Sequence, residues 1–187
     1  MIRSFIAIEI PDFIRSQVAD LQDEMRRLHS HVSWVAPRNI HVTMKFLGNI
    51  QESLVLQIGN ILGEVSSRTR PFEITIENLG FFPNPRRPRV LWVGVTDRQQ
   101  RLKSLFQEIE KGLLPLGFMR EKRGFTPHLT IGRVRNSRGI NEVVDKMRSY
   151  HFPSQSFEAK EAVLLKSTLK PTGAVYEALG RFEFKGM

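Results

Sequence analysis

The sequence predicts an α+β fold that is built from helices and antiparallel sheet and is duplicated as two facing lobes. Segments with helical and with strand periodicity alternate along the chain, and two adjacent strand pairs indicate hairpins. A short polar motif also occurs twice in matching surroundings. With 187 residues, of which 41% are hydrophobic, the chain is long enough to bury a core.

Four segments carry apolar residues at steps of three and four, the spacing that places them on one helix face. Aspartates stand at the start of the first and third segments, and we expect Asp12 and Asp97 to cap these helices. The expected helices cover residues 12–29, 51–66, 97–114 and 141–149.

Seven segments have the composition and the alternation of β-strands. The third and fourth follow each other without a helix between them, as do the last two, so both pairs are expected to form hairpins. The expected strands cover residues 3–10, 40–47, 72–79, 89–95, 128–134, 157–166 and 175–184.

The two halves of the chain repeat one order of elements around a motif strand. The motif strands are "HVTMKFLG", which begins at His41, and "HLTIGRV", which begins at His128. Their separation is longer than the repeat of a solenoid, so two facing lobes are favoured over an array. We therefore predict a single bilobal domain over residues 1–187, with pseudo-repeats around His41 and His128.

The composition narrows the class of partner and compartment. The chain has 28 Lys and Arg against 19 Asp and Glu, a net charge of +9, which favours polyanions such as nucleic acid. It has no cysteine, which excludes disulfides, thiolate nucleophiles and Cys-ligated zinc. The apolar run near the start is too short to span a bilayer. We expect a cytoplasmic monomer with no membrane contact and no obligate protein partner.

Each motif strand carries a histidine and a threonine on one face. Side chains alternate along a strand, so His41 and Thr43 point the same way, as do His128 and Thr130. If the lobes face each other, two imidazoles flank two hydroxyls. One neutral imidazole can then take a proton while a protonated one gives a proton, and the hydroxyls can donate to phosphate oxygens. The set favours in-line displacement at phosphorus without a metal or other cofactor.

Structural and metal-binding interpretations compete with this one. A single His-x-Thr on a strand is usually a satisfied polar pair, but two in matching contexts favour a shared function. Threonine is a poor ligand for the metals that imidazole prefers, and no carboxylate stands at ligand spacing beside either motif. His29 and His31 have His-x-His spacing but lie at an expected helix end, where a structural role is favoured.

A basic loop in "PNPRRPR" carries Arg86, Arg87 and Arg89. Such a loop is most often a solvated hairpin connection, and contact with RNA is the alternative. The sequence leaves both interpretations open.

The motif strands, together with "SFIAIEIP", "VLWVGV" and "LLKSTLKPTGAVYEAL", resemble the two-histidine phosphoesterase superfamily. Within it, the chain is most similar to the RNA 2′,3′-cyclic phosphodiesterases, historically called 2′-5′ RNA ligases, over essentially its whole length. The resemblance implies a bilobal α+β fold with an antiparallel sheet in each lobe and an active-site cleft between the lobes. It also implies metal-independent hydrolysis of a 2′,3′-cyclic phosphate at an RNA 3′ end to a 2′-phosphomonoester.

The resemblance also assigns roles to the motif residues. By this analogy His128 is the general base that activates water, and His41 is the acid that protonates the leaving O3′. Thr43 and Thr130 hold the phosphate. The substrate is an RNA end or a small cyclic nucleotide.

Two further binding residues follow from the resemblance. Phe46 would stack on the base, and Arg133 would bind phosphate. Strict alternation, however, places both side chains on the faces opposite their motif histidines, so each strand must end or twist there. Gly48 and Gly132 would permit such a change.

Two alternative functions use the same residues. A 2′-5′ RNA ligase would run the reverse reaction, but nothing in the sequence supplies ATP or an activated end, so water favours hydrolysis. A non-catalytic RNA-binding module would keep the cleft, and the intact set of two histidines and two threonines argues against it.

Overall fold

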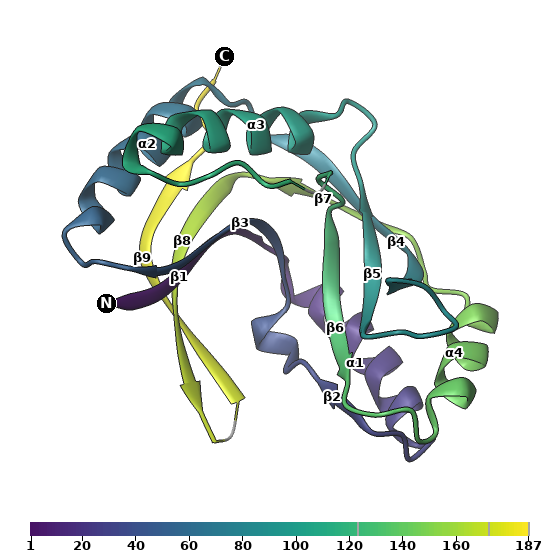
Figure 1. Cartoon of the computed structure of the whole chain (residues 1–187). Coiled ribbons are helices and arrows are strands. Elements are labelled where there is room, and N and C mark those ends of the chain that lie inside the picture. Colours follow the sequence, from purple (N-terminus) through teal and green to yellow (C-terminus); the bar gives the residue numbers. More distant parts are fainter. Residues whose placement is uncertain (123, 172, 187) are drawn as a thin grey trace.

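A curled antiparallel sheet forms the framework of the molecule, with helices on its outer face and its inner face left open (Figure 1). The computed structural model describes residues 1–122, 124–171 and 173–186. Within them, the strands are β1 (Ile2–Glu9), β2 (Val32–Trp34), β3 (His41–Ile50), β4 (Phe72–Phe82), β5 (Val90–Thr96), β6 (His128–Val134), β7 (Gln155–Ala159), β8 (Glu161–Lys170) and β9 (Gly173–Glu183). The helices are α1 (Asp12–Arg26), α2 (Leu54–Arg68), α3 (Arg101–Leu113) and α4 (Ile140–Ser149), with short 3₁₀ turns at Pro37–Asn39 and Leu114–Leu116.

The sheet consists of two halves that meet at its centre. The strand order is β7-β4-β5-β6-β3-β1-β8-β9, and β2 adds to β6 outside this order. The halves join where β3 pairs with β6 through Val42 and Leu129. Strands from both parts of the chain contribute to each half, since β7 pairs with β4 and β8 pairs with β1. The motif strands therefore lie side by side at the junction.

The core fills the space between the outer face of the sheet and the helices. Helix α1 contributes Ile14, Val18 and Leu21, and β1 contributes Ile6 and Ile8, all of them at most 1% exposed. Each such side chain contributes about 1.5 to 3 kcal/mol by leaving water. Because strand side chains alternate, burying the isoleucines of β1 turns its other side chains toward the open inner face.

The predicted duplicated α+β fold is confirmed, and several expected elements begin or end at other residues. Helix α1 ends at Arg26 rather than at residue 29, and Pro11, not Asp12, occupies the N-cap position. Helix α3 begins at Arg101, later than expected. Asp97 still caps it from a distance, because its Oδ2 accepts a hydrogen bond from the Leu102 amide at 2.7 Å.

The expected strand over residues 157–166 is two strands, and this expectation was wrong. Strand β7 ends at Ala159 and pairs with β4, while β8 begins at Glu161 and pairs with β1. The chain changes partners at Lys160, whose carbonyl accepts the Phe184 amide at 2.7 Å. The short strand β2 was not expected. Among the described helices, none combines the length and the apolar character that a membrane crossing needs.

Candidate active site

The two motif strands present their polar residues to the inner face of the sheet. Val42 and Leu129 are fully buried in the core on the outer face. Their antiparallel pairing sets each motif histidine beside the threonine of the other motif, across the junction of the two sheet halves. The side chains brought together in this way are those of His41, Thr43, His128 and Thr130.

A backbone carbonyl fixes the orientation of the His41 ring. Its Nδ1 lies 2.7 Å from the Asn39 carbonyl oxygen, and its Nε2 lies 3.1 Å from the Thr43 hydroxyl. Because a carbonyl only accepts, Nδ1 carries the hydrogen in the neutral ring, and Nε2 then accepts from Thr43. The Nε2 atom is therefore the one that takes up or releases a proton.

His128 is held in the same way. Its Nδ1 lies 2.7 Å from the carbonyl oxygen of Thr126, which stands two residues before it, as Asn39 stands before His41. The hydrogen on Nδ1 again leaves Nε2 as the basic atom. The two repeats thus prepare two imidazoles with the same tautomer.

Aromatic rings enclose both histidines. Phe5 stacks on His41, with ring centroids 4.7 Å apart and planes inclined by 27°, and Tyr176 meets His41 edge-on at 5.5 Å. Phe82 meets His128 edge-on at 4.9 Å. These contacts restrict the rings and exclude water from one side of each.

The enclosure lowers the pKa of His41 from 6.5 to about 4, mainly because burial disfavours the charged ring. The Asn39 carbonyl and Glu9 oppose this effect, whereas Arg15 and His128 add to it. The pKa of His128 is also lowered, first by burial and then by Arg133, and the hydrogen bond to the Thr126 carbonyl opposes the shift. Both rings are therefore predominantly neutral near pH 7 in the free protein.

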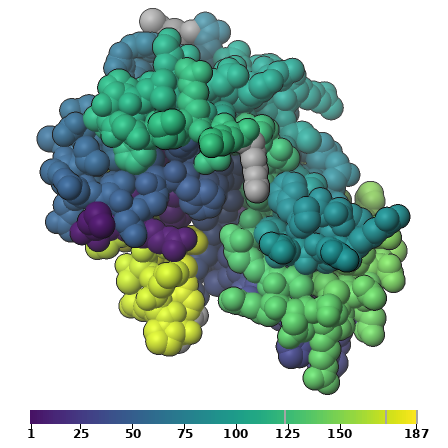
Figure 2. Space-filling model, in the orientation of Figure 1, coloured from purple at the N-terminus to yellow at the C-terminus, as the bar shows by residue number. Residues whose placement is uncertain are grey.

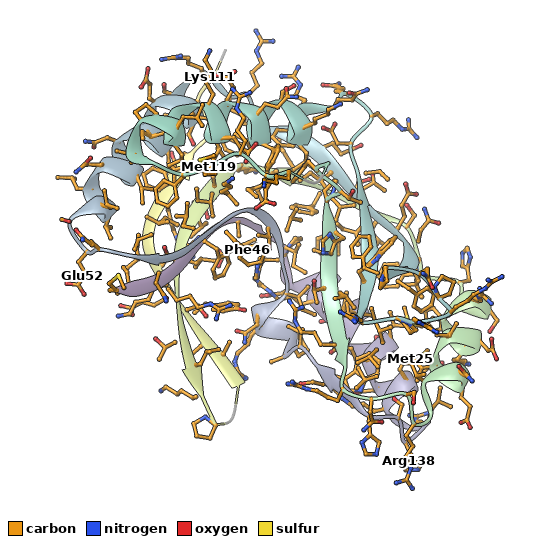
Figure 3. The ribbon with its side chains drawn as sticks, viewed as in Figure 1. Met25, Phe46, Glu52, Lys111, Met119 and Arg138 are labelled. Carbon is orange, nitrogen blue, oxygen red and sulfur yellow. The ribbon has the colours of Figure 1, made fainter. Side chains whose placement is uncertain are left out.

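A β-bulge in β3 turns Phe46 toward the site. Thr43 pairs with Ala7, but Lys45 pairs with Ile6, so Met44 is an extra residue in the strand. The alternation therefore shifts by one residue after the motif. Phe46 emerges on the inner side of β3 with 59% of its surface exposed (Figure 3).

The same device acts on Arg133 in β6. Thr130 pairs with Trp92 and Gly132 with Leu91, so Ile131 is the extra residue. Arg133 is exposed and influences the pKa of His128. The strand twist that the sequence required for both assignments is thus supplied by two equivalent bulges. Near the first, Gly48 adopts a φ of +71°, which favours glycine.

A buried ion pair holds the first bulge. The Lys45 ammonium pairs with the Glu110 carboxylate of α3, and both residues are less than 10% exposed. Lys45 also donates to the Met119 carbonyl at 2.7 Å, and Glu110 accepts the Glu121 amide at 2.7 Å. Met119 lies between β3 and α3, on the side away from Phe46 (Figure 3). The pair therefore ties β3 to α3 and to the loop that leads toward His128.

A buried glutamine holds the second bulge. Gln22 of α1 is fully buried, and its Nε2 donates to the carbonyl of Ile131 at 2.8 Å and to that of Val35 at 2.7 Å. Glu110 and Gln22 occupy corresponding places in the helices that precede the two motif strands. Each helix thus supports the motif strand of the other repeat.

A cleft of about 400 Å³ lies beside His41 on the inner face. Figure 2 shows the hollow between the β8–β9 hairpin, in yellow, and the green and teal surface on the other side of the molecule. Its walls include Arg3, Phe5, His41, Phe46, Arg133 and Tyr176. The structure thus brings Phe46 and Arg133 to one cavity with His41.

Other polar features lie apart from the cleft or at its margin. His31 contacts Asn136 through its Nδ1 at 3.0 Å. Within residues 1–122, 124–171 and 173–186, no group of three or more His, Cys, Asp or Glu side chains is arranged to hold a metal ion. The arginines of the basic loop are exposed, and the loop directly follows Phe82, on the His128 side: Arg86, Arg87 and Arg89.

Sequence reasoning missed the aromatic residues that enclose the histidines and the ion pair beneath Phe46. Phe5 alternates with the buried isoleucines of β1, so its inward direction was available from periodicity. Tyr176 lies in the C-terminal segment that carried part of the family resemblance, although its contact with His41 depends on tertiary structure. Nothing near Lys45 in the sequence identifies Glu110 as its partner.

Comparison with known proteins places this geometry in a family. The model of the LigT-like phosphoesterase family matches residues 8–92 and again residues 93–176. A relative from Archaeoglobus fulgidus, named RNA 2′,3′-cyclic phosphodiesterase, is 39% identical over 184 residues, covering 97% of this chain and 99% of the relative. One of the same name from Methanocaldococcus jannaschii is 36% identical over 180 residues, covering 95% and 98%. The structure of E. coli LigT complexed with 3′-AMP has a TM-score of 0.79 at 23% identity, covering 98% of each chain.

Proposed function

Because the chain belongs to the LigT-like phosphoesterase family and is an RNA 2′,3′-cyclic phosphodiesterase, we propose that it opens the cyclic phosphate to a 2′-phosphomonoester by metal-independent acid–base catalysis between its two motif histidines. The observation that carries this proposal is the matched pair of imidazoles. Each is held through Nδ1 by a backbone carbonyl, and each offers Nε2 for proton transfer.

The reaction needs one proton acceptor and one proton donor. In the proposed mechanism a water oxygen attacks phosphorus while its proton passes to Nε2 of His128. The P–O3′ bond breaks as protonated Nε2 of His41 gives its proton to O3′. The product carries its phosphate on O2′ and a free 3′ hydroxyl. Each positioned proton transfer contributes about 10² to 10⁴ in rate.

The substrate itself prepares His41 for the acid role. In the free protein the lowered pKa keeps this ring neutral at pH 7. A cyclic phosphate carries a negative charge, and an opposite charge a few ångströms from the ring raises the pKa of the imidazole. Binding the anion in a site screened by Phe5 and Tyr176 therefore favours the protonated form that the leaving oxygen needs.

The groups between the histidines support the developing charge on phosphorus. Thr43 and Thr130 can each donate a hydroxyl hydrogen to a non-bridging oxygen, and the Arg133 guanidinium adds a positive charge on the same face. Phe46 and Arg133 occupy equivalent positions but differ in chemistry. This difference supplies the asymmetry by which a substrate distinguishes the two halves of the cleft.

The regiochemistry of the product tests the proposal. Hydrolysis of 2′,3′-cyclic AMP in EDTA is expected to give adenosine 2′-phosphate, because a base stacked on Phe46 places O3′ beside His41. Phosphorus NMR distinguishes the 2′ and 3′ products. The Phe46→Ala variant is expected to raise KM and to yield both isomers.

Two results would contradict this assignment. A predominantly 3′-phosphate product from the unmodified protein would show that His41 is not the acid that protonates O3′, and the assigned roles of His41 and His128 would have to be reversed. Loss of activity in EDTA, with recovery on adding a divalent ion, would show that a metal takes part. Leu56→Ala removes an exposed apolar side chain of α2 and serves as the control for Phe46→Ala.

The pH dependence of kcat/KM is expected to be bell-shaped, with its optimum below pH 6.5. This constant reports the free enzyme, in which one ring must be charged and the other neutral. Because both pKa values are lowered, that of His41 to about 4, the required charge is lost as pH rises. Above pH 6.5, kcat/KM should fall by up to about tenfold per unit. Initial rates at low substrate between pH 4 and 8 provide the measurement, and a profile that rises toward pH 8 would refute the assignment.

A further inference from the structure

We propose that Arg3 forms a second anion subsite in the cleft, which binds the phosphate on the 5′ side of the terminal nucleotide. This inference rests on the proposed function, because it uses the orientation in which O3′ lies beside His41. It makes the enzyme selective for a nucleotide that continues into an RNA chain over a cyclic nucleotide with a free 5′ hydroxyl.

Strand β1 places Arg3 on the same face as the site. Its buried residues, Ile6 and Ile8, alternate with residues that face inward, so Arg3 and Phe5 point into the cleft. Phe5 stacks on His41, and Arg3 follows two residues further from the reacting centre, paired with Asn49 of β3. The Arg3 side chain thus lies at the end of the cleft that is farther from His41.

The walls between Arg3 and His41 suit a nucleoside. Phe46 and Tyr176 offer aromatic surface in the same cavity, and its volume of about 400 Å³ lies in the range of small-molecule sites. A base and its ribose placed there would have the cyclic phosphate at the His41 end. The other phosphate of that nucleotide would then lie toward Arg3.

Two arginines, Arg3 and Arg133, lie near Tyr176, and this arrangement favours the binding of two separate anions. Burial raises the pKa of its hydroxyl, while Arg133 and Arg3 both lower it, so the two guanidiniums lie near this ring. In the part of the chain that the structure describes, neither arginine forms an ion pair with a carboxylate. Arg133 influences His128 as well, which assigns it to the cyclic phosphate. Arg3 is then available for a second phosphate.

In-line geometry decides on which side the RNA chain leaves. Water and the leaving O3′ lie on opposite sides of phosphorus, so the ribose lies on the His41 side when water is beside His128. The basic loop follows Phe82, which contacts His128, and therefore lies on the water side. The next phosphate of the chain accordingly approaches Arg3 rather than Arg86 or Arg87.

The test compares substrates that differ only at the 5′ position. These are 2′,3′-cyclic AMP, the same nucleotide with a 5′-phosphate, and the dinucleotide ApA ending in a 2′,3′-cyclic phosphate. The dinucleotide presents the diester of an RNA chain, and the 5′-phosphate presents a monoester. For each protein variant, the measured quantity is the ratio of kcat/KM with and without the 5′ phosphate group.

The Arg3→Gln variant is expected to lower this ratio about tenfold for both phosphate-bearing substrates, since it removes one charge-assisted contact. Arg3→Lys keeps the charge and should restore part of the loss. Arg87→Gln makes the same charge change in the exposed basic loop and should leave the ratio as it is. The salt dependence of the dinucleotide reaction should also become weaker in Arg3→Gln alone.

Several outcomes would overturn the subsite. An unchanged ratio in Arg3→Gln would do so, even if kcat/KM falls equally for all substrates, because Arg3 would then act on the cyclic end or on the fold. If the ratio falls in Arg87→Gln and not in Arg3→Gln, the basic loop and not Arg3 binds the 5′ phosphate. If Arg3→Gln lowers the ratio for the 5′-phosphate mononucleotide but not for the dinucleotide, Arg3 does not bind the phosphodiester of an RNA chain. An unmodified protein that hydrolyses none of the substrates would refute the proposed function itself.

Discussion

Replacing either motif histidine with alanine is expected to lower kcat by about 10² to 10⁴, because each ring has a proton-transfer role that the other cannot fill in the same step. His41 and His128 sit on the inner face, outside the main core, so the fold should persist in both variants. Single-turnover hydrolysis of 2′,3′-cyclic AMP measures the loss, and a circular dichroism melt reports the fold.

Two comparisons separate catalysis from structure. His151→Ala removes an exposed imidazole and should change neither rate nor melt. The variant that lacks both motif histidines should lose little more than the more damaged single variant, since residues that act as a unit are not additive. Near-normal turnover in a well-folded His41→Ala or His128→Ala protein would make that histidine structural.

The Lys45→Met variant is expected to lose about 3 to 5 kcal/mol of unfolding free energy, because it leaves the buried Glu110 carboxylate without its counter-charge. Adding Glu110→Gln should recover much of that loss, since the amide keeps an acceptor for the Glu121 N–H without a charge. Urea unfolding of the three proteins measures these differences.

An exposed ion pair provides the matched control. Lys166 and Glu177 are joined across β8 and β9 with side chains 36% and 67% exposed, so Lys166→Met should cost less than about 1 kcal/mol. If Lys45→Met costs as little as this control, or if the double variant is no more stable than Lys45→Met, the ion pair does not hold the bulge as described.

The local sequence pattern was sufficient to predict most of the helices and strands and the duplication of the fold. The helices around Val18 and Leu105 follow from their apolar spacing, and the motif histidines and threonines share a face as alternation requires. The duplication was visible because the repeated residues are polar and stand in otherwise apolar strands. These features depend on neighbours within a few positions in the chain.

The parts that were missed depend on distant partners. The bulge residues Met44 and Ile131 are apolar like their neighbours, so only the register against β1 and β5 reveals them. The break at Lys160 arises because β7 and β8 pair with strands in opposite halves of the sheet, β4 and β1. Such pairings are decided by packing across the whole sheet and leave no local signature.

The pairing of β1 with β8 has a consequence for how the protein is made. Strand β1 pairs early with β3, but its second neighbour, β8, is synthesised only at residues 161–170, and Tyr176 follows later still. A partly made chain can therefore hold the first motif strand but not the wall that encloses its histidine. The environment that lowers the pKa of His41 is therefore complete only when β8 and β9 have been synthesised and have paired.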